Sequence, residues 1–266
     1  MSLKIVVLAK QVPDTRNVGK DAMNADGTIN RAALPAIFNP EDLNALEQAL
    51  RLKDTHPGST VTILTMGPGR AAEIIREGLY RGADNGYLLT DRAFAGADTL
   101  ATSYALATAI KKIGDYDLII GGRQAIDGDT AQVGPQISEH LDIPVISYAQ
   151  DIKVEDNFVI VQRQYDDRYH VLKAQMPCLV TALGEMNEPR YMTPGGIFDA
   201  CDAEITVWGR ANLVDVEDSN LGLKGSPTQI AKASDKVRKG AGEKVALDPT
   251  EAVAYIMDKL TEKHVI

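Results

Sequence analysis

The sequence predicts an α/β protein built on a doubly wound, mostly parallel sheet, because buried-strand patterns alternate with amphipathic helix patterns. Short apolar runs occupy residues 4–10, 61–64, 87–89 and 118–120, and a helical pattern follows each of them. Open sheets of this kind bind ligands in the crevice outside the carboxyl ends of their strands. We therefore expect a binding site where these strands end.

Two of the helices can be placed from their apolar periodicity. The pattern that begins at Asn39 puts leucines on one face, and Asn39 and Pro40 suit the N-cap and the first helical position. A second pattern with the same spacing begins near Asp98. Each helix follows a predicted strand, as the alternating arrangement requires.

The pattern changes after Pro144. Runs rich in β-forming residues occupy 145–152, 158–164 and 169–173, with a polar turn at 165–168, and these predict an antiparallel hairpin added to the core. Residues 180–183 predict another strand that returns to the sheet. The stretch 186–200 is too long and too rich in proline and glycine for a tight turn, so we expect a functional or mobile loop there.

The C-terminal part differs in composition from the rest. Residues 219–244 are polar and locally basic, as in a linker. Asp248 then begins a helix pattern with apolar residues on one face. Because one isolated amphipathic helix cannot bury its apolar face, we expect a domain at 1–218 and an extended C-terminal arm at 219–266 that docks on another surface. Packing of the arm on its own domain is the alternative.

Composition limits the function classes. The 266 residues carry a formal net charge of −9, which argues against nucleic-acid binding. No run approaches the ~20 apolar residues of a membrane span, and no signal-peptide pattern is present at the start, so we expect a cytoplasmic protein. Cys178 and Cys201 fit no Cys-x-x-Cys spacing and the histidines are scattered, so no metal site is expected. Any redox chemistry would sit on an organic cofactor.

Residues 121–134 link the strand at 118–120 to a helix and form the most informative segment of the chain. Gly121, Gly122 and Gly128 allow close backbone approach and conformations that a Cβ forbids, and Asp129 or Thr130 can cap the helix. The free N–H groups of such a helix start favour a phosphate. The loop has neither a P-loop nor a Rossmann fingerprint. From the residues alone, nucleotide binding and an ordinary strand-to-helix turn remain equal alternatives.

The same loop resembles the signature loop of the beta (small) subunit of electron-transfer flavoproteins. The segments 9–14, 39–42, 65–68 and 187–191 are similar to that family in the family's order, and the resemblance covers most of the chain. Within the family, residues 91–103 and 127–135 resemble the electron-bifurcating branch found in anaerobes. The ordinary branch has a different loop at this position.

This resemblance implies one bound FAD, with AMP as the alternative, and NADH as a substrate. The implied cofactor-binding residues are Ala9, Asn39, Pro40, Glu41, Asp42, Met66, Gly122, Arg123, Gln124, Ala125, Ile126, Asp127, Gly128, Asp129, Thr130, Gln132, Val133 and Gly134. For Met66 a gap-filling core methionine is the alternative. Because they follow the carboxyl ends of neighbouring strands, our candidates for the NADH side are Pro68, Gly69, Arg92 and Phe94. For Arg92 a solvated surface position is equally compatible.

A flavin pyrophosphate on this loop would meet backbone N–H groups between Ala125 and Thr130, and we expect these to bind most of the anion. Arg123 is the only cation of the loop. Asp127 and Asp129 would repel phosphate, so we expect their carboxylates to cap nearby N–H groups or to accept from ribose hydroxyls. No side chain is expected to act as a nucleophile or a general base.

The resemblance also implies partners. The arm would embrace an electron-transfer flavoprotein alpha subunit, and the docking residues for a partner flavin dehydrogenase, of the acyl-CoA or 2-hydroxy-acid type, would be Asn187, Glu188, Pro189, Arg190 and Tyr191. Residues 199–204 are acidic where family members often carry a lysine-rich run. Electrons from NADH would pass to ferredoxin or flavodoxin and, through the alpha-subunit FAD, to the dehydrogenase. The alternatives are an ordinary electron carrier with structural AMP and a non-redox, adenine-nucleotide-binding regulatory module.

Overall fold

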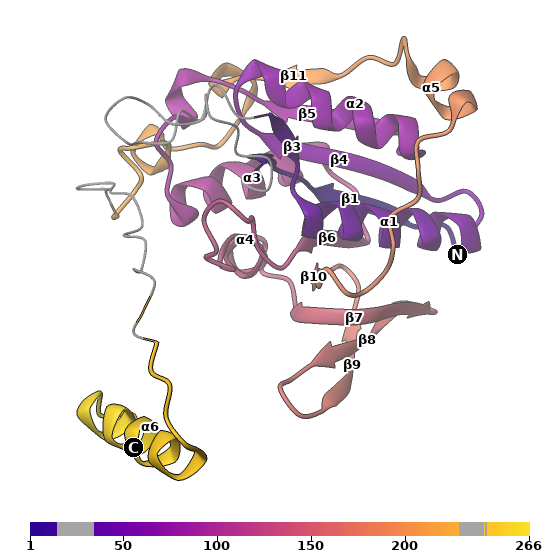
Figure 1. Ribbon diagram of the computed structural model, residues 1–266. Coiled ribbons are helices and arrows are strands. Elements are labelled where there is room, and N and C mark those ends of the chain that lie inside the picture. The colour runs from indigo at the N-terminus through magenta and orange to yellow at the C-terminus, as the bar shows by residue number, and fades with distance from the viewer. Residues whose placement is uncertain (15–34, 229–241, 243) are drawn as a thin grey trace. The chain divides into compact units, whose positions relative to one another are not determined.

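The computed structural model describes residues 1–14, 35–228, 242 and 244–266 (Figure 1). The chain forms two units, Met1–Ala231 and Lys232–Ile266. Residues 219–228, which the sequence predicts as the start of the arm, thus lie in the first unit. The predicted basic linker falls partly outside the described residues.

A nine-stranded sheet in the order β11-β5-β4-β1-β6-β10-β7-β8-β9 forms the centre of the first unit (Figure 1). Its strands are β1 (Lys4–Leu8), β4 (Thr60–Met66), β5 (Asn85–Leu89), β6 (Leu118–Gly122), β7 (Val145–Glu155), β8 (Phe158–Gln164), β9 (Tyr169–Gln175), β10 (Cys178–Ala182) and β11 (Thr206–Trp208). All neighbours pair in parallel except β7 with β8 and β8 with β9, which are antiparallel. The predicted doubly wound, mostly parallel sheet with an added antiparallel hairpin is confirmed.

Helices cover both faces of this sheet. α1 (Pro40–Thr55) and α2 (Ala72–Arg81) pack on one face, and α3 (Thr99–Ile113) and α4 (Val133–Leu141) pack on the other. Successive side chains of a strand point to opposite faces of the sheet, so alternate residues contact different helices. In β1, Ile5 and Val7 belong to the core under α1 and α2, whereas Val6 and Leu8 belong to the core under α3 and α4. A continuous apolar run is therefore required, because both faces of the strand are buried.

Several short elements were not predicted. β2 (Gln11–Pro13) and β3 (Ala36–Phe38) form a separate antiparallel pair, and short 3-10 turns follow some strands: η2 (Gly69–Ala71), η3 (Arg92–Phe94), η4 (Arg210–Asn212) and η5 (Asp218–Asn220). The stretch 186–200, expected to be irregular, contains α5 (Pro194–Ala200), which Thr193 caps by accepting from the Gly196 N–H. The 3-10 turns and α5, of three to seven residues, are too short for a helical period to show in the sequence.

The second unit contains α6 (Pro249–Glu262). As predicted, the helix begins after Asp248, whose carboxylate accepts from the N–H groups of Thr250 and Glu251. None of its residues is buried, and Val253 and Ile256 are exposed. No helix in the described part of the chain is long and apolar enough to cross a membrane.

Close packing between α2 and β5 predicts a destabilising substitution. A Cβ on Gly86 would lie 2.0 Å from Cγ2 of Ile75, which is fully buried and branched at Cβ. We expect Gly86→Ala to lower the free energy of unfolding by about 1–3 kcal/mol, since extra volume in a packed core forces strained side chains. Gly69→Ala is the control, because a Cβ there meets nothing within 4 Å. Urea unfolding of both variants tests this, and equal stability of the two would contradict it.

Candidate functional site

A cavity of about 740 Å³ lies at the carboxyl ends of β1, β4 and β6. From β1 the chain builds β4 and β5 outward on one side and then returns to add β6 on the other, where β10 and β7 follow in the sheet. The cavity therefore lies at the point where the strand order reverses, which is the usual ligand site of an open α/β sheet. Its apolar wall consists of Leu8, Leu64, Met66, Phe94, Leu106 and Val133.

Hydrogen bonds join the start of α1 to the loop 121–134. The Glu41 carboxylate accepts from Arg123 Nη2 at 2.8 Å and from the Gln124 N–H at 3.0 Å. The Asn39 side chain donates to the Gln124 carbonyl at 2.9 Å and accepts from the Ile126 N–H at 3.1 Å. Asn39 occupies the predicted N-cap position but does not cap its own helix with its side chain. It holds the loop instead.

Asp42 lies at the centre of this junction. Its Oδ2 accepts from the Lys10 N–H and its Oδ1 from the Gly122 N–H, each at 2.9 Å. A Cβ on Gly122 would lie 2.5 Å from Asp42 Oδ1, so glycine is required for this close approach. Burial raises the pKa of the Asp42 carboxyl from its ordinary 3.8 to about 7, although the hydrogen bonds that it accepts act in the opposite direction.

The loop reaches α4 by a route that the sequence did not predict. Its left-handed residues are Asp129, with φ 49°, and Ala131, with φ 53°, whereas none of its glycines has a positive φ. The expectation that the glycines supply unusual backbone conformations is therefore wrong. Gly134 serves packing, because a Cβ there would lie 2.7 Å from Cγ2 of Thr181.

The expected cap of α4 is also wrong. The helix begins at Val133 with Gln132 as N-cap residue, so Asp129 and Thr130 lie before its first turn. The Asp129 carboxylate instead accepts from Gln124 Nε2 at 2.9 Å. Two left-handed residues between the loop and the helix move the helix start beyond the reach of these side chains.

Asp127 has a partner that sequence analysis missed. Its carboxylate forms an ion pair with Lys10 Nζ at 2.7 Å and caps no backbone N–H among the described residues, whereas the expected alternative, a contact with ribose hydroxyls, stays a prediction. Lys10 offsets the negative charge that would repel a phosphate, so Arg123 is not the only cation beside the loop. The signal for Lys10 was its position at the end of the first predicted strand, at the same sheet edge as the loop.

The loop keeps donors for a ligand. The N–H groups of Gln124, Ile126, Gly128 and Asp129 are used within the protein. Those of Ala125, Asp127 and Thr130 meet no acceptor among the described residues. Within the same residues, the buried Nε of Arg123 also has no hydrogen-bond partner. This donor set suits an anion such as a phosphate.

The structure brings together most of the predicted cofactor residues. Those that line the cavity are Ala9, Asp42, Met66, Gly122, Arg123, Gln124, Ala125, Asp127, Gly128, Thr130, Gln132, Val133 and Gly134. The others, Asn39, Pro40, Glu41, Ile126 and Asp129, do not line it. Of the candidates for the NADH side, Phe94 lines the cavity, whereas Pro68, Gly69 and Arg92 are exposed outside it.

The cavity has further walls that sequence analysis did not assign. They include Gly96, Ala97, Asp98, Thr99, Thr102 and Thr228. Asp98 caps α3 by accepting from the Leu100 and Ala101 N–H groups, and it accepts from Thr228 Oγ1 at 2.7 Å. Asp98 could have been found as a helix start near the end of β5. Thr228 lies in a polar segment that contains no sequence pattern indicating a binding site.

The segment 187–191 lies on α1, away from the cavity. Arg190 forms ion pairs with Glu47 at 2.9 Å and with Asp54 at 2.8 Å, and its carbonyl accepts from Arg81. Burial alone would raise the pKa of Glu47, but hydrogen bonds from Arg190 and Arg51 bring it below the ordinary value. Tyr191 is 91% exposed, so this anchored segment presents an aromatic ring to solvent.

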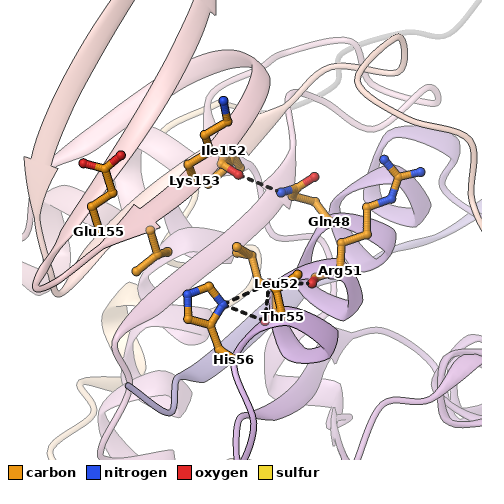
Figure 2. Close-up of a pocket in the computed structure, with 9 residues that line it drawn as sticks. Gln48, Arg51, Leu52, Thr55, His56, Ile152, Lys153 and Glu155 are labelled. Carbon is orange, nitrogen blue, oxygen red and sulfur yellow. Dashed lines mark hydrogen bonds between the residues drawn. The ribbon is translucent and has the colours of Figure 1, made fainter.

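A smaller hollow of about 350 Å³ lies between α1 and β7 (Figure 2). Gln48 bridges it by donating to the Ile152 carbonyl, and the ring of His56 turns back to the Leu52 carbonyl (Figure 2). Its polar groups thus serve the protein itself. Among the described residues, no cluster of three His, Cys, Asp or Glu side chains could hold a metal ion.

Comparison with known proteins identifies the family. A family model described as the electron transfer flavoprotein domain matches residues 26–213. The electron transfer flavoprotein subunit beta of Clostridium acetobutylicum is 49% identical over 264 residues, which are 99% of this chain and 100% of that protein. The chain belongs to the electron transfer flavoprotein family, among its beta subunits.

Two further relatives of this electron transfer flavoprotein subunit are named as parts of reductase systems. The caffeyl-CoA reductase-Etf complex subunit CarD of Acetobacterium woodii is 49% identical over 265 residues, covering 99% of this chain and 100% of that protein. The acryloyl-CoA reductase electron transfer subunit gamma of Anaerotignum propionicum is 46% identical over 270 residues, with 99% and 100% covered. The resemblance seen in the sequence motifs is confirmed at the level of the family.

The buried Asp42 carboxyl predicts a pH-dependent stability. Its pKa is about 7 in the folded chain against an ordinary value of 3.8, so between these values the folded chain holds a proton that the unfolded chain has released. The proton held by Asp42 stabilises the folded chain at low pH. The free energy of unfolding that it contributes falls by up to about 1.4 kcal/mol per pH unit as the pH rises towards 7.

Asp42→Asn lacks this titration, although it leaves one N–H without an acceptor at every pH. We therefore expect the unfolding free energy of the wild type, minus that of Asp42→Asn, to fall between about pH 5 and 7 and to level off above. Urea unfolding of both proteins across this range measures the difference. A difference that stays constant or rises with pH would contradict the raised pKa of Asp42.

Proposed function

We propose that the chain is the beta subunit of an electron-bifurcating electron transfer flavoprotein in the cytoplasm. It binds one FAD in the cavity, takes a hydride from NADH and sends one electron to ferredoxin or flavodoxin. The other electron passes through an FAD of the alpha subunit to a partner flavin dehydrogenase. The observation that carries the proposal is the cavity at the reversal of strand order, closed on one side by the loop 121–134.

The cavity has two kinds of wall, and together they support the proposal that its ligand is a nucleotide. One wall is apolar and includes Leu8, Leu64 and Phe94, which suits the flat face of a ring system. The other consists of loop backbone with Arg123 and Lys10 beside it. Its unpartnered N–H groups would hold phosphate oxygens, and Asp127 would not repel them strongly because Lys10 pairs with it.

In this proposal the FAD supplies the hydride and electron chemistry. The residues of the chain bind and orient the nucleotide, and none acts as a nucleophile or a general base. Phe94 is the NADH-side candidate that borders the cavity, whereas Pro68, Gly69 and Arg92 would contact NADH only beyond its rim. The arm, with the apolar face of α6, would contact the alpha subunit.

The partner dehydrogenase is proposed to be of the acyl-CoA type in preference to the 2-hydroxy-acid type. Two relatives carry the names of a caffeyl-CoA and an acryloyl-CoA reductase system, which supports this choice. The exposed Tyr191, held at its base by Arg190, would dock on that enzyme together with Asn187, Glu188 and Pro189.

The second candidate is an ordinary electron carrier in which this cavity holds AMP. The donors of the loop allow it, because the N–H groups of Ala125, Asp127 and Thr130, which meet no acceptor among the described residues, would serve a single phosphate as well as a pyrophosphate. A non-redox regulatory module that binds an adenine nucleotide is a third candidate. A tightly bound yellow cofactor in the complex would exclude it.

The deciding experiment is the flavin content of the complex after co-expression with the alpha subunit, followed by anaerobic titration with NADH. We expect two flavins per heterodimer and direct reduction by NADH. One flavin with released AMP would contradict bifurcation and support the ordinary carrier. Absorbance near about 450 nm counts the flavins, since oxidised flavin is the chromophore that the cofactor contributes.

Gly128 offers a test of the cavity that spares the fold. A Cβ there meets nothing within 4 Å, yet the residue lines the cavity, so Gly128→Val adds bulk only on the ligand side. We expect a loss of bound nucleotide of at least about tenfold with stability changed by less than about 0.5 kcal/mol. Gly69→Val, outside the cavity, is the matched control. Nucleotide content after gel filtration, together with urea unfolding, measures both, and full retention in Gly128→Val would contradict the assignment.

A further inference from the structure

Asp42 lines the cavity, yet its carboxyl is buried and has no cationic partner among the described residues. The residue is 7% exposed. The groups that donate to it are neutral: the backbone N–H groups of Lys10 and Gly122, and the side chain of Asn39. A carboxylate that is removed from water without a cation beside it is costly, and burial therefore favours the protonated form.

The other charges next to Asp42 are already paired. Lys10 Nζ, from the end of β1, pairs with Asp127 of the loop at 2.7 Å, and Arg123 of the loop pairs with Glu41 of α1 at 2.8 Å. These two pairs contribute no net charge. The protonation state of Asp42 thus decides the local charge, which is neutral when the carboxyl holds its proton and negative when it does not.

Asp98 is another carboxyl that lines the cavity, but its donors differ from those of Asp42. Two backbone N–H groups of α3 donate to it, and so do the N–H and the hydroxyl of Thr228. Burial alone would raise its pKa, but these hydrogen bonds bring the pKa below the ordinary value. Asp98 is therefore ionised at neutral pH with or without a ligand. No histidine lines the cavity, and Lys10 neutralises Asp127, so Asp42 is the lining residue whose charge can respond to a ligand.

We propose that the cavity binds its anionic nucleotide together with one proton, which Asp42 takes up. The inference rests on the proposed function, because it requires a ligand with phosphate groups in the cavity. Phosphate oxygens near the loop bring negative charge into a site that water screens little. An ionised Asp42 repels this charge and a protonated Asp42 does not. Because coupling between two bound species is reciprocal, the ligand strengthens proton binding and the proton strengthens ligand binding.

The pH dependence of nucleotide binding has a defined sign. Burial raises the pKa of the Asp42 carboxyl to about 7, and a bound anion raises that pKa further. Between the two pKa values the free chain has lost a proton that the bound chain holds, so binding takes up a proton. The affinity for the anion is therefore full below about pH 7 and falls as the pH rises above it.

The test measures FAD binding to the full chain by isothermal titration calorimetry, in buffers of different ionisation enthalpy and from about pH 6 to 9. FAD is the probe because its pyrophosphate is a diester, whereas the phosphate monoester of AMP itself titrates near about pH 6. We expect uptake of up to about one proton per FAD, and a Kd that rises by up to about tenfold per pH unit above about pH 7.

Two substitutions assign the proton to a residue. Asp42→Asn has no titrating group, so we expect no proton uptake and a Kd for FAD that stays within about twofold across the pH range. Asp84→Asn is the matched control. Asp84 also accepts from a strand N–H, that of Val61 at 2.8 Å, but Lys53 pairs with it at 2.7 Å and it precedes β5, at the edge of the sheet opposite the cavity. We expect this control to take up as many protons as the wild type.

The results that overturn the inference differ from those that overturn the proposed function. If the wild-type chain binds FAD without proton uptake, or if Asp42→Asn takes up as many protons as the wild type, the inference is wrong while the proposed function stands. If the wild-type chain does not bind FAD, both fail. The comparison of buffers on the wild type needs no variant, so a folding defect in Asp42→Asn leaves the inference open to refutation.

Discussion

The hydrogen bonds between the start of α1 and the end of β6 are the interaction on which the site depends. One carboxyl, that of Asp42, accepts N–H groups from the ends of β1 and β6, and this fixes the two strands at the reversal of strand order. Asparagine offers one acceptor oxygen where two N–H groups converge. A Cβ at Gly122 would collide with the same carboxyl. The close approach of three backbone segments therefore demands these two residue types together.

The hydrogen bonds of this junction hold the beginning of the loop 121–134 more tightly than its tip. Asn39 and Glu41 bind residues 123–126, whereas the backbone around Gly128 lies open to the cavity. Some donors of the loop are thus used within the protein, and the remaining ones belong to residues that line the cavity, Ala125, Asp127 and Thr130. The charges are distributed in the same way, because Lys10 and Glu41 pair with two of the three charged side chains of the loop, Asp127 and Arg123. A site built from backbone donors and paired charges holds an anion without a strongly basic surface.

The sequence predicted what depends on local pattern and missed what depends on long-range contact. The strands other than β2, β3 and β11, the helix starts at residues 39 and 98, and the loop itself follow from periodicity and breakers, and the structure confirms them. The pairing of Lys10 with Asp127 joins positions 117 residues apart, and no local pattern records it. The left-handed residues Asp129 and Ala131 were missed because a positive φ costs glycine nothing, and glycines lie nearby in the loop. Thr228 reaches the cavity only because residues 221–228 pack beside α3.

The contact between Thr228 and Asp98 adds a wall to the cavity from a segment far from the loop 121–134 in the sequence. Thr228 donates to Asp98, Ser226 accepts from the Asp98 N–H at 2.8 Å, and Leu221 is buried in the core under α3 and α4. The cap of α3 is therefore shared between the helix and the segment that leads towards the second unit. A carboxylate that caps a helix and also accepts from a distant threonine holds both elements in place, since loss of either partner leaves donors unsatisfied. The cavity is thus closed by the part of the chain that the sequence assigned to the arm, so the cavity needs those residues to be complete.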